Sequence, residues 1–215
     1  MTRRRQFALL IAFVCVVEAL PLRADSSVAC APDATSLYFP CSSCHGARAE
    51  GSEAFAAPAL AGLDAPYVRR QLVLFQTGAR GSHPTDVHGQ QMTLIARTLG
   101  SSSAVEAVAC HVAALPAPPR PLPTLEGDVR RGARLYAASC AACHGLGADG
   151  IRELGAPALQ ALADWYVLAQ LDGFRLGWRG SDPADSLGQS MRAASMALTG
   201  PRDARDVAAF LARQR

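Results

Sequence analysis

The sequence matches itself without a gap when Cys41 is placed on Cys140, a shift of 140 − 41 = 99 residues. About half of the positions from Cys41 to Met92 are then identical in the second copy. Chance does not produce an ungapped match of that length, so the chain contains two copies of one unit. Any feature on which the fold depends is therefore expected twice, at the same spacing.

The repeated residues form a series of motifs in the same order in both copies. They are Cys-x-x-Cys-His-Gly at 41–46 and 140–145, Pro-Ala-Leu at 58–60 and 157–159, Tyr-Val-x-x-Gln-Leu-x-x-Phe at 67–75 and 166–174, Gly-x-Arg-Gly-Ser at 78–82 and 177–181, and Gly-Gln-x-Met at 89–92 and 188–191.

A proline-rich stretch separates the two copies. Five of the eight residues from 116 to 123 are proline, which favours an extended, semi-rigid spacer. We therefore predict a first domain at 25–115, a linker at 116–125 and a second domain at 126–215. Each domain, of about 90 residues, builds only a modest core, and a large fixed cofactor would supply part of what is missing.

Hydrophobic periodicity predicts helices separated by loops. We expect helices at 129–139, with Asp128 as N-cap, at 104–115 and at 203–213, and helical segments that begin near 66 and 165. The sequence shows no useful stretch of β-alternation. The predicted fold class is all-α.

The first residues have the form of a secretory signal peptide. Arg3 to Arg5 precede a short apolar run at 7–17, and Ala24 is a plausible cleavage position, so we expect residues 1–24 to be removed and the protein to be periplasmic. A retained membrane anchor, a lipoprotein site at Cys30 and a twin-arginine signal are the alternatives. Without residues 1–24 the chain has 17 basic and 17 acidic residues, which gives no case for nucleic-acid binding.

The repeated cysteine motif carries the chemistry. Cys-x-x-Cys-His is the attachment pattern of haem c: the two thiols bond to the porphyrin, and the next residue, histidine, becomes an iron ligand. The motif predicts two covalent haems. A zinc site or a redox-active disulfide is the rival interpretation, but zinc requires further Cys or His that the repeat does not supply. The residues concerned are Cys41, Cys44 and His45, and Cys140, Cys143 and His144.

The sixth iron ligand should be present in both copies. Met92 aligns with Met191, whereas His83, His88 and His111 align with residues other than histidine. We therefore predict His/Met ligation, although His83 and His88 are near enough to Met92 in sequence to compete with it. Thioether ligation raises the reduction potential, and an iron without an open position favours electron transfer over catalysis.

With these motifs the chain resembles the dihaem cytochrome c4 family, which consists of tandem class I cytochrome c domains. The resemblance covers nearly all of the chain after residue 24. It implies that the Pro58 and Pro157 carbonyls accept hydrogen bonds from the haem-ligating histidines. It also implies haem propionates as partners of Arg80 and Arg179, with a solvated surface arginine as the alternative.

The first copy departs from the family pattern before its haem motif. It lacks the Gly-Asp-x-x-x-Gly of residues 127–132, and Tyr38 lies three residues before Cys41 whereas Tyr136 lies four before Cys140. The first N-terminal helix is therefore expected to be altered or shortened. Because the N-terminal and terminal helices pack together in class I cytochromes, the resemblance predicts a Cys30–Cys110 disulfide, which an oxidising compartment permits.

The function expected is that of a non-enzymatic electron carrier that feeds a terminal oxidase. Its partners would be redox proteins: a membrane cytochrome oxidase, a bc1-type complex or a dehydrogenase, reached free in the periplasm or peripheral to the membrane. Three alternatives remain open at this point. They are a dihaem peroxidase-like enzyme, a cytochrome subunit of a periplasmic dehydrogenase, and a haem-based sensor or binding module.

Overall fold

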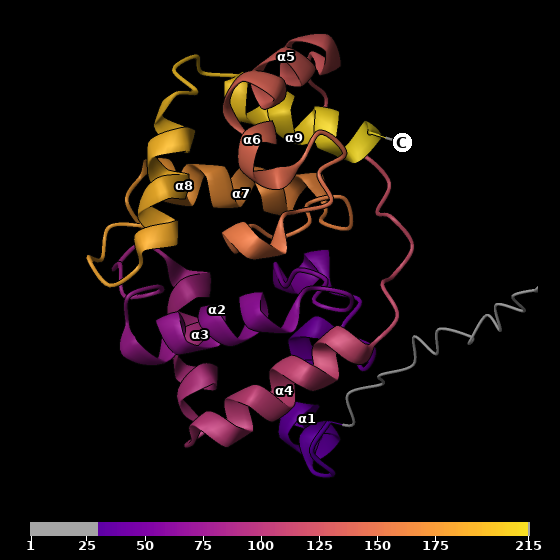
Figure 1. Cartoon of the computed structure of the whole chain (residues 1–215), viewed down its shortest axis with the longest axis vertical. Helices are drawn as coiled ribbons and strands as arrows, with labels where there is room; N and C mark the ends of the chain where they lie inside the picture. Colours follow the sequence, from indigo (N-terminus) through magenta and orange to yellow (C-terminus); the bar gives the residue numbers. More distant parts are fainter. Residues whose placement is uncertain (1–29, 215) are drawn as a thin grey trace, which may run out of the picture.

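The computed structural model describes residues 30–214 as two helical lobes stacked along the long axis (Figure 1). The expected signal peptide therefore lies outside the described residues. Apart from two isolated bridges, Ser52–Ala57 and Ile151–Ala156, the described part of the chain contains no β-structure, which confirms the all-α prediction. The first lobe consists of α1 (Ala34–His45), η1 (Glu53–Phe55), α2 (Ala65–Thr77), α3 (Val87–Arg97) and α4 (Ser102–Ala114). The second consists of α5 (Val129–Ser139), α6 (Ala141–His144), η2 (Arg152–Leu154), α7 (Asp164–Arg175), α8 (Ser186–Met196) and α9 (Asp203–Arg213).

The helices begin where the sequence supplies caps. Asp128 accepts a hydrogen bond from the Arg131 amide at the start of α5, as predicted. The helices α3 and α8 were missed, although Asp86 and Asp185 accept from the amides three residues further on in the same way. These two aspartates cap the first turns of the helices that contain Met92 and Met191.

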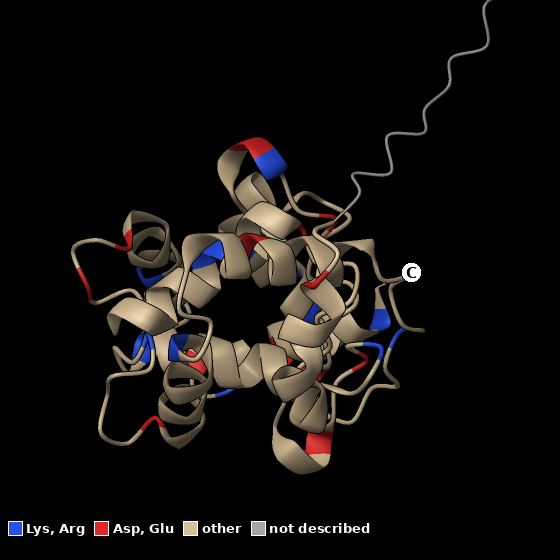
Figure 2. Ribbon diagram, turned by 90° about the horizontal axis from the view of Figure 1, so that it is seen from below, with Lys and Arg blue, Asp and Glu red and all other residues tan. Residues whose placement is uncertain are grey.

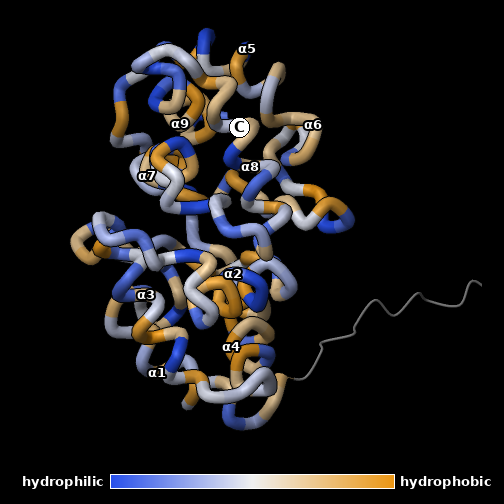
Figure 3. The backbone as a smooth tube through the Cα atoms, turned by 90° about the vertical axis from the view of Figure 1, so that its left-hand side faces the viewer, coloured by the Kyte–Doolittle hydropathy of each residue, from blue (hydrophilic) through white to orange (hydrophobic). Residues whose placement is uncertain are grey.

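Each lobe surrounds its own hydrophobic core. In the first lobe α4 packs against α1 and α2, and in the second α9 packs against α5 and α7. Figure 3 shows the hydrophobic stretches of α2 and α4 side by side. Val105, Val108 and Val112 supply the buried face of α4, and Val207, Ala208 and Leu211 supply that of α9. The repeat in the sequence is therefore a repeat in the packing.

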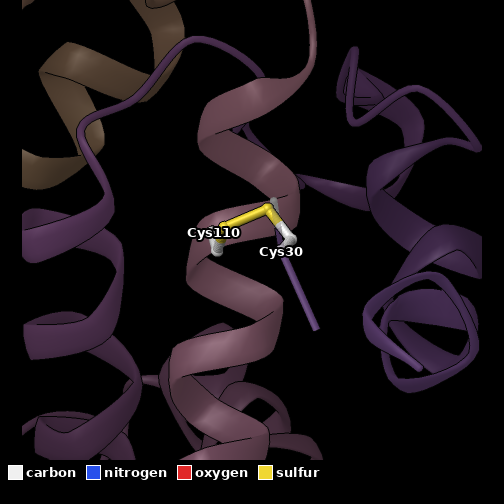
Figure 4. The surroundings of a disulfide bond; sticks show 2 residues. All are labelled: Cys30 and Cys110. Carbon is white, nitrogen blue, oxygen red and sulfur yellow. A yellow bond between two sulfur atoms is a disulfide. The ribbon is translucent and has the colours of Figure 1, made fainter. Parts of the chain in front are cut away.

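The first lobe has a disulfide between its first segment and its last helix. Cys30 and Cys110 are joined, with Cα atoms 5.6 Å apart, and Figure 4 shows Cys110 on α4. The predicted pairing is confirmed. It ties the chain just before α1 to the helix on which α1 packs.

The haem-motif helices differ between the lobes as the sequence predicted. The single helix α1 runs through Pro40 and the whole first motif, whereas a break at Cys140 separates α5 from α6. Only seven residues of α1 precede Cys41, against the eleven of α5. The first N-terminal helix is thus the shortened one.

The connection between the lobes, residues 115–128, contains no helix. Leu115 and Ala117 pack on the first lobe, and the part from Arg120 onward is attached to the second. The buried carboxylate of Asp164 accepts hydrogen bonds from the Thr124 amide (2.7 Å), the Thr124 hydroxyl (2.7 Å) and the Leu125 amide (2.8 Å). Arg120 donates to the side chain of Gln160 at 2.6 Å. The predicted limits of the linker, 116–125, remain a prediction. The contacts above place its second half on the surface of the second lobe.

Direct contacts also join the lobes. Arg70 donates to the Gly155 carbonyl at 2.9 Å, Asp64 forms an ion pair with Arg152, and the rings of His83 and Trp178 lie 5.9 Å apart. Basic and acidic positions are interspersed along the ribbon (Figure 2). Within residues 30–214 no helix is long and apolar enough to cross a bilayer.

Candidate haem sites

Each haem motif lies at the end of a helix, with its histidine inside the lobe and its second cysteine at the surface. His45 and His144 are buried, while Cys44 and Cys143 are exposed and the first cysteines are half-buried. None of the four motif cysteines forms a disulfide in the described structure. This placement leaves the thiols of each motif near the surface, with the imidazole directed inward.

A tyrosine that precedes each motif in sequence supports it, from the same helix α1 in the first lobe and from α5 in the second. The Tyr38 hydroxyl donates to the Gly46 carbonyl at 2.9 Å, and the Tyr136 hydroxyl donates to the Gly145 carbonyl at 2.7 Å. The two tyrosines lie at different distances in sequence from their cysteines, yet they make the same contact. The continuous α1 and the break between α5 and α6 absorb the difference of one residue.

Both histidines are oriented by a proline carbonyl. The His45 Nδ1 atom lies 2.8 Å from the Pro58 oxygen, and the His144 Nδ1 atom lies 2.9 Å from the Pro157 oxygen. This is the hydrogen bond that the resemblance implied. It places the proton on Nδ1 and leaves the Nε2 lone pair free for a metal.

Glycines make this approach of the loop possible. Gly51 and Gly150 have φ values of 83° and 81°, and a Cβ atom on either would lie 2.7 Å from the carbonyl carbon of Pro58 or Pro157. Any other residue would displace the carbonyl that holds the histidine. The equivalent glycines of the two copies therefore have a function in the site.

Methionine faces histidine in the second lobe. The His144 Nε2 atom lies 3.4 Å from the Met191 sulfur, which α8 carries. Met92 lies at the equivalent position of α3, half-buried against the first core. A neutral imidazole opposite a thioether is a donor pair suited to haem iron.

Burial sets the protonation of these groups. It lowers the pKa of His45 and His144, with the proline carbonyls acting in the opposite direction, so both imidazoles are neutral near pH 7. Burial also raises the pKa of Cys41 and raises that of Cys140 to about 11, where the charge of Cys143 contributes. Neutral imidazoles are the form that can coordinate iron.

The other three histidines have positions unlike that of an iron ligand. His111 on α4 lies 5.1 Å from the Tyr38 ring, just as Phe210 on α9 lies 5.5 Å from the Tyr136 ring, so His111 takes the place of a packing aromatic residue. His83 accepts from the Thr85 amide at 3.3 Å and lies near Trp178. His88 is exposed on α3.

The structure places Arg80 and Arg179 between the lobes rather than at an outer surface. Each donates to the side chains of Gln71 and Gln170, and each guanidinium lies 4.3 Å from the ring of Phe75 or Phe174 in its own lobe. The alternative of a solvated surface arginine is therefore wrong for Arg179, which is 8% exposed. Sequence reasoning missed the two glutamines, although both copies contain them at the same position.

A pocket in the second lobe brings these groups together. Its lining includes Cys140, Cys143, His144 and Met191 with apolar side chains around them. Three residues of the first lobe, Tyr67, Arg70 and Gln71, complete it. Thiols at the rim and facing donors inside fit a haem c. Among residues 30–214 no cluster of three or more Cys, His, Asp or Glu side chains is placed to hold a metal ion.

Comparison with known proteins agrees with this geometry. The family model described as cytochrome c matches residues 129–214. A protein of Stutzerimonas stutzeri (strain A1501) named as a thiosulfate dehydrogenase electron acceptor is 39% identical over 166 residues, which cover 72% of each chain. The chain belongs to the cytochrome c family. Covalent haem c is accordingly its cofactor, and electron transfer is its general activity.

Solved structures share the architecture of this cytochrome. Reduced cytochrome c4 from Pseudomonas stutzeri has a TM-score of 0.67 at 21% identity, covering 85% of this chain and 97% of its own. A thiosulfate dehydrogenase, TsdBA, from Marichromatium purpuratum has a TM-score of 0.64 at 29% identity, covering 81% of this chain and 36% of its own. The expectation of two tandem class I cytochrome c domains in the c4 arrangement is confirmed as a description of the fold.

Proposed function

We propose that this cytochrome is a periplasmic dihaem electron carrier that accepts electrons from a thiosulfate dehydrogenase and passes them towards a terminal oxidase. The facing His144 and Met191 carry the proposal, because a haem iron held by both would have no coordination position open to a substrate. A bound haem c supplies one-electron exchange between Fe(III) and Fe(II). The protein's own part is to attach, orient and enclose it.

The choice of donor rests on the relatives. A second protein named as a thiosulfate dehydrogenase electron acceptor, from Thiomonas intermedia (strain K12), is 34% identical over 74% of this chain and 71% of its own length. The terminal oxidase is supported by a cbb3-type cytochrome c oxidase subunit, FixP, of Bradyrhizobium sp. (strain ORS 278). It is 34% identical over 55% of this chain and 40% of its own length. A bc1-type complex is the other membrane partner to be tested.

The partner proposal is tested with purified proteins. The oxidised cytochrome is mixed with a thiosulfate dehydrogenase and thiosulfate, and its reduction is followed by absorption in a stopped-flow instrument. We expect reduction that depends on the dehydrogenase concentration, and reoxidation by a cbb3-type oxidase. A mitochondrial cytochrome c serves as the control carrier. If neither partner exchanges electrons with this protein faster than with the control, the proposed partners are wrong.

The proposed iron ligands are His45 with Met92 in the first lobe and His144 with Met191 in the second. The variants Met92→Ala and Met191→Ala should each lower the potential of one haem only, on the order of 100 mV or more, because the axial ligand is a main determinant of haem potential. Met196→Ala is the matched control, since Met196 lies on α8 but is 52% exposed. Unchanged potentials in both ligand variants would remove the assignment.

The count of two haems has its own test. Thioether bonds to Cys41 and Cys44, and to Cys140 and Cys143, predict two haems per chain by pyridine haemochrome assay. Replacing both cysteines of one motif with serine should halve that value. A wild-type ratio of one haem per chain would contradict the dihaem assignment.

A peroxidase-like enzyme is the alternative from a different class. The oxidised carrier should show the weak long-wavelength sulfur-to-iron band with an intensity that corresponds to two Met-ligated irons. It should also fail to turn over hydrogen peroxide. A high-spin signal together with rapid peroxide turnover would favour the enzyme.

Export and domain limits belong to the same proposal. Mass spectrometry of the protein from the periplasm should find a chain that starts after Ala24, and membrane washing tests whether it is peripheral. Limited proteolysis should cut first within residues 116–125. An intact N-terminus, or cuts inside either lobe before the linker, would contradict these limits.

A further inference from the structure

Four side chains form one hydrogen-bonded cluster across the boundary between the lobes. Arg80 donates to Gln71 of its own lobe at 2.7 Å and to Gln170 of the other lobe at 2.9 Å. Arg179 donates to Gln170 at 2.6 Å and to Gln71 at 3.0 Å. Each amide oxygen therefore accepts from both guanidinium groups, and each guanidinium group bridges both lobes.

The cluster carries two positive charges and no negative charge. Among residues 30–214 neither Arg80 nor Arg179 forms an ion pair with a carboxylate. Burial lowers the pKa of Arg179, and the charge of Arg80 lowers it further. Arg179 is buried and Arg80 is half-buried beside it, and both have only neutral acceptors. Like charges held this way are costly, so an anion bound at the cluster would stabilise it.

One donor of the cluster is still free to bind that anion. The Nε atom of Arg179 is buried and has no hydrogen-bond partner among the described residues. Stacking of each guanidinium on a phenylalanine ring, Phe75 or Phe174, fixes its plane. The free N–H edge therefore has a set direction, as recognition of a carboxylate requires.

The haem pocket reaches this cluster. Arg179 and Gln170 line the pocket of the second lobe together with Gln71 of the first lobe. Haem c has two propionate carboxylates, which are the anions a covalently attached haem would bring to such a place. The repeat puts Arg80 and Gln71 in the equivalent position for the first lobe.

We propose that Arg80 and Arg179 form a single clamp shared by the propionates of both haems, so that each arginine raises the reduction potential of the haem in the other lobe as well as in its own. The proposal rests on the dihaem assignment above but not on the identity of the electron donor. It makes the docking of the lobes a determinant of both potentials.

The direction of the effect follows from charge. A nearby cation favours the reduced iron, which carries one positive charge less, and the effect is stronger at a buried site than in water. Loss of one guanidinium should therefore lower the potential. Because each guanidinium lies within hydrogen-bond distance of residues from both lobes, its loss should lower the reduction potential of both haems.

The test is a redox titration with mediators of Arg80→Gln and Arg179→Gln, each as the full dihaem chain. The two ferric haems are followed separately by NMR of their methyl signals, assigned with Met92→Ala and Met191→Ala. We expect both midpoints to shift to lower potential in each arginine variant. A shift confined to the haem of the substituted lobe, or no shift at all, would overturn the shared clamp.

Two control variants separate charge from loosening of the interface. Arg152→Gln breaks the ion pair with Asp64 between the lobes but leaves the cluster intact, so both midpoints should stay at their wild-type values. Arg80→Lys retains the charge, so both midpoint potentials should return most of the way from their Arg80→Gln values to the wild-type values. Equal shifts in Arg152→Gln, or no rescue by lysine, would contradict a clamp that acts through its charge.

A solvent anion is the other possible source of negative charge. Titration of the wild-type protein with phosphate should leave both midpoints unchanged beyond the effect of ionic strength measured with a chloride salt. A saturating, phosphate-specific shift would mean that an exchangeable anion occupies the cluster, and would overturn the assignment to propionates. Pyridine haemochrome values for every variant show whether the dihaem assignment itself has failed.

Discussion

The same pair of helices is fastened by different chemistry in the two lobes. In the first, the disulfide between Cys30 and Cys110 ties the start of α1 to α4. In the second, Arg131 of α5 forms ion pairs with Asp206 (2.6 Å) and Asp203 (2.8 Å) of α9. The lobe in which fewer helical residues precede the haem motif has the covalent link. The comparison indicates that loss of helical packing can be offset by a constraint on the unfolded chain.

The lobes agree where they enclose the haem. Hydrogen bonds from tyrosine to glycine and from histidine to proline recur in both, at distances that differ by at most 0.2 Å. Divergence is concentrated in the outer helix pair. The haem side of the duplicated unit is therefore retained, and the way its outer helices are joined is free to change.

Removal of the disulfide should have the largest effect. The bond closes a loop with a sequence separation of 80, for which the chain-entropy relation gives about 4.5 kcal/mol of stability. Cys110→Ser should destabilise the first lobe by up to that amount and leave the second unchanged. Hydrogen exchange of peptides from α4 and α9 measures the two lobes separately.

Reduction of the Cys30–Cys110 disulfide in the wild-type protein is the control for this substitution. It should reproduce the faster exchange in α4, because it breaks the same bond without changing a side chain's packing. Equal acceleration in α9 would mean that the disulfide stabilises the whole molecule rather than one lobe.

Loss of the ionic fastening should have the next largest effect, in the opposite lobe. Asp206 is 2% exposed and also accepts from the Asp128 amide at 2.9 Å. Asp206→Ala leaves that amide and the Nε atom of Arg131 without their acceptor, although Asp203 still pairs with the guanidinium, and the cost should be about 3 kcal/mol. Denaturation followed by circular dichroism should show it.

Asp172→Ala is the matched control in the same lobe. The Asp172 side chain is 46% exposed and pairs with Arg175 at 3.6 Å, so its loss should cost less than about 0.5 kcal/mol. If the two aspartate variants are equally stable, the ionic fastening of α5 to α9 has no role in stability.

Acid should produce the smallest effect and should act on the second lobe. Burial alone raises the pKa of Asp164, but hydrogen bonds from Leu125, Thr124 and Trp165 outweigh it and hold the pKa below its ordinary value. A depressed pKa contributes stability that is present above about pH 4 and is lost as the pH falls through the folded value. The first copy has alanine at the equivalent position, Ala65.

The measurement is the pH dependence of stability in wild type and Asp164→Asn. The free energy of unfolding of the wild type should exceed that of Asp164→Asn by about 1–2 kcal/mol at neutral pH, and this difference should disappear in acid. A constant difference between the two proteins from pH 7 to pH 3 would contradict the role given to this carboxylate.

Much of the site could be predicted because its parts lie close together in sequence or recur at a fixed spacing. Helix 203–213 was placed at its observed limits, since Asp203 and the apolar positions that follow it form a local pattern. The Cys30–Cys110 bond followed from the resemblance because it joins two helices whose packing is common to the family. The assignment of Met92 and Met191 as ligands stays a prediction.

What could not be predicted depends on contacts between the copies. Gln170 is 90 residues from Arg80, and Gln71 is 108 residues from Arg179. Periodicity within one copy says nothing about which faces of the two copies meet, because docking is decided by long-range packing. The helices α3 and α8 were a different case, since their aspartate caps were visible in the sequence and were overlooked.

Arg120, Thr124 and Leu125 are hydrogen-bonded to the second lobe, and Ala117 packs beside Gly62 of the first. The part of the connection held by packing alone is therefore residues 116–119. Four residues in an extended proline-rich conformation reach about 12 Å, so lobes released from each other would stay at a very high effective concentration. Reassociation is then a unimolecular event that dilution does not weaken. Cleavage within 116–119 would convert it into an ordinary bimolecular equilibrium, with the lobes parting as the protein is diluted.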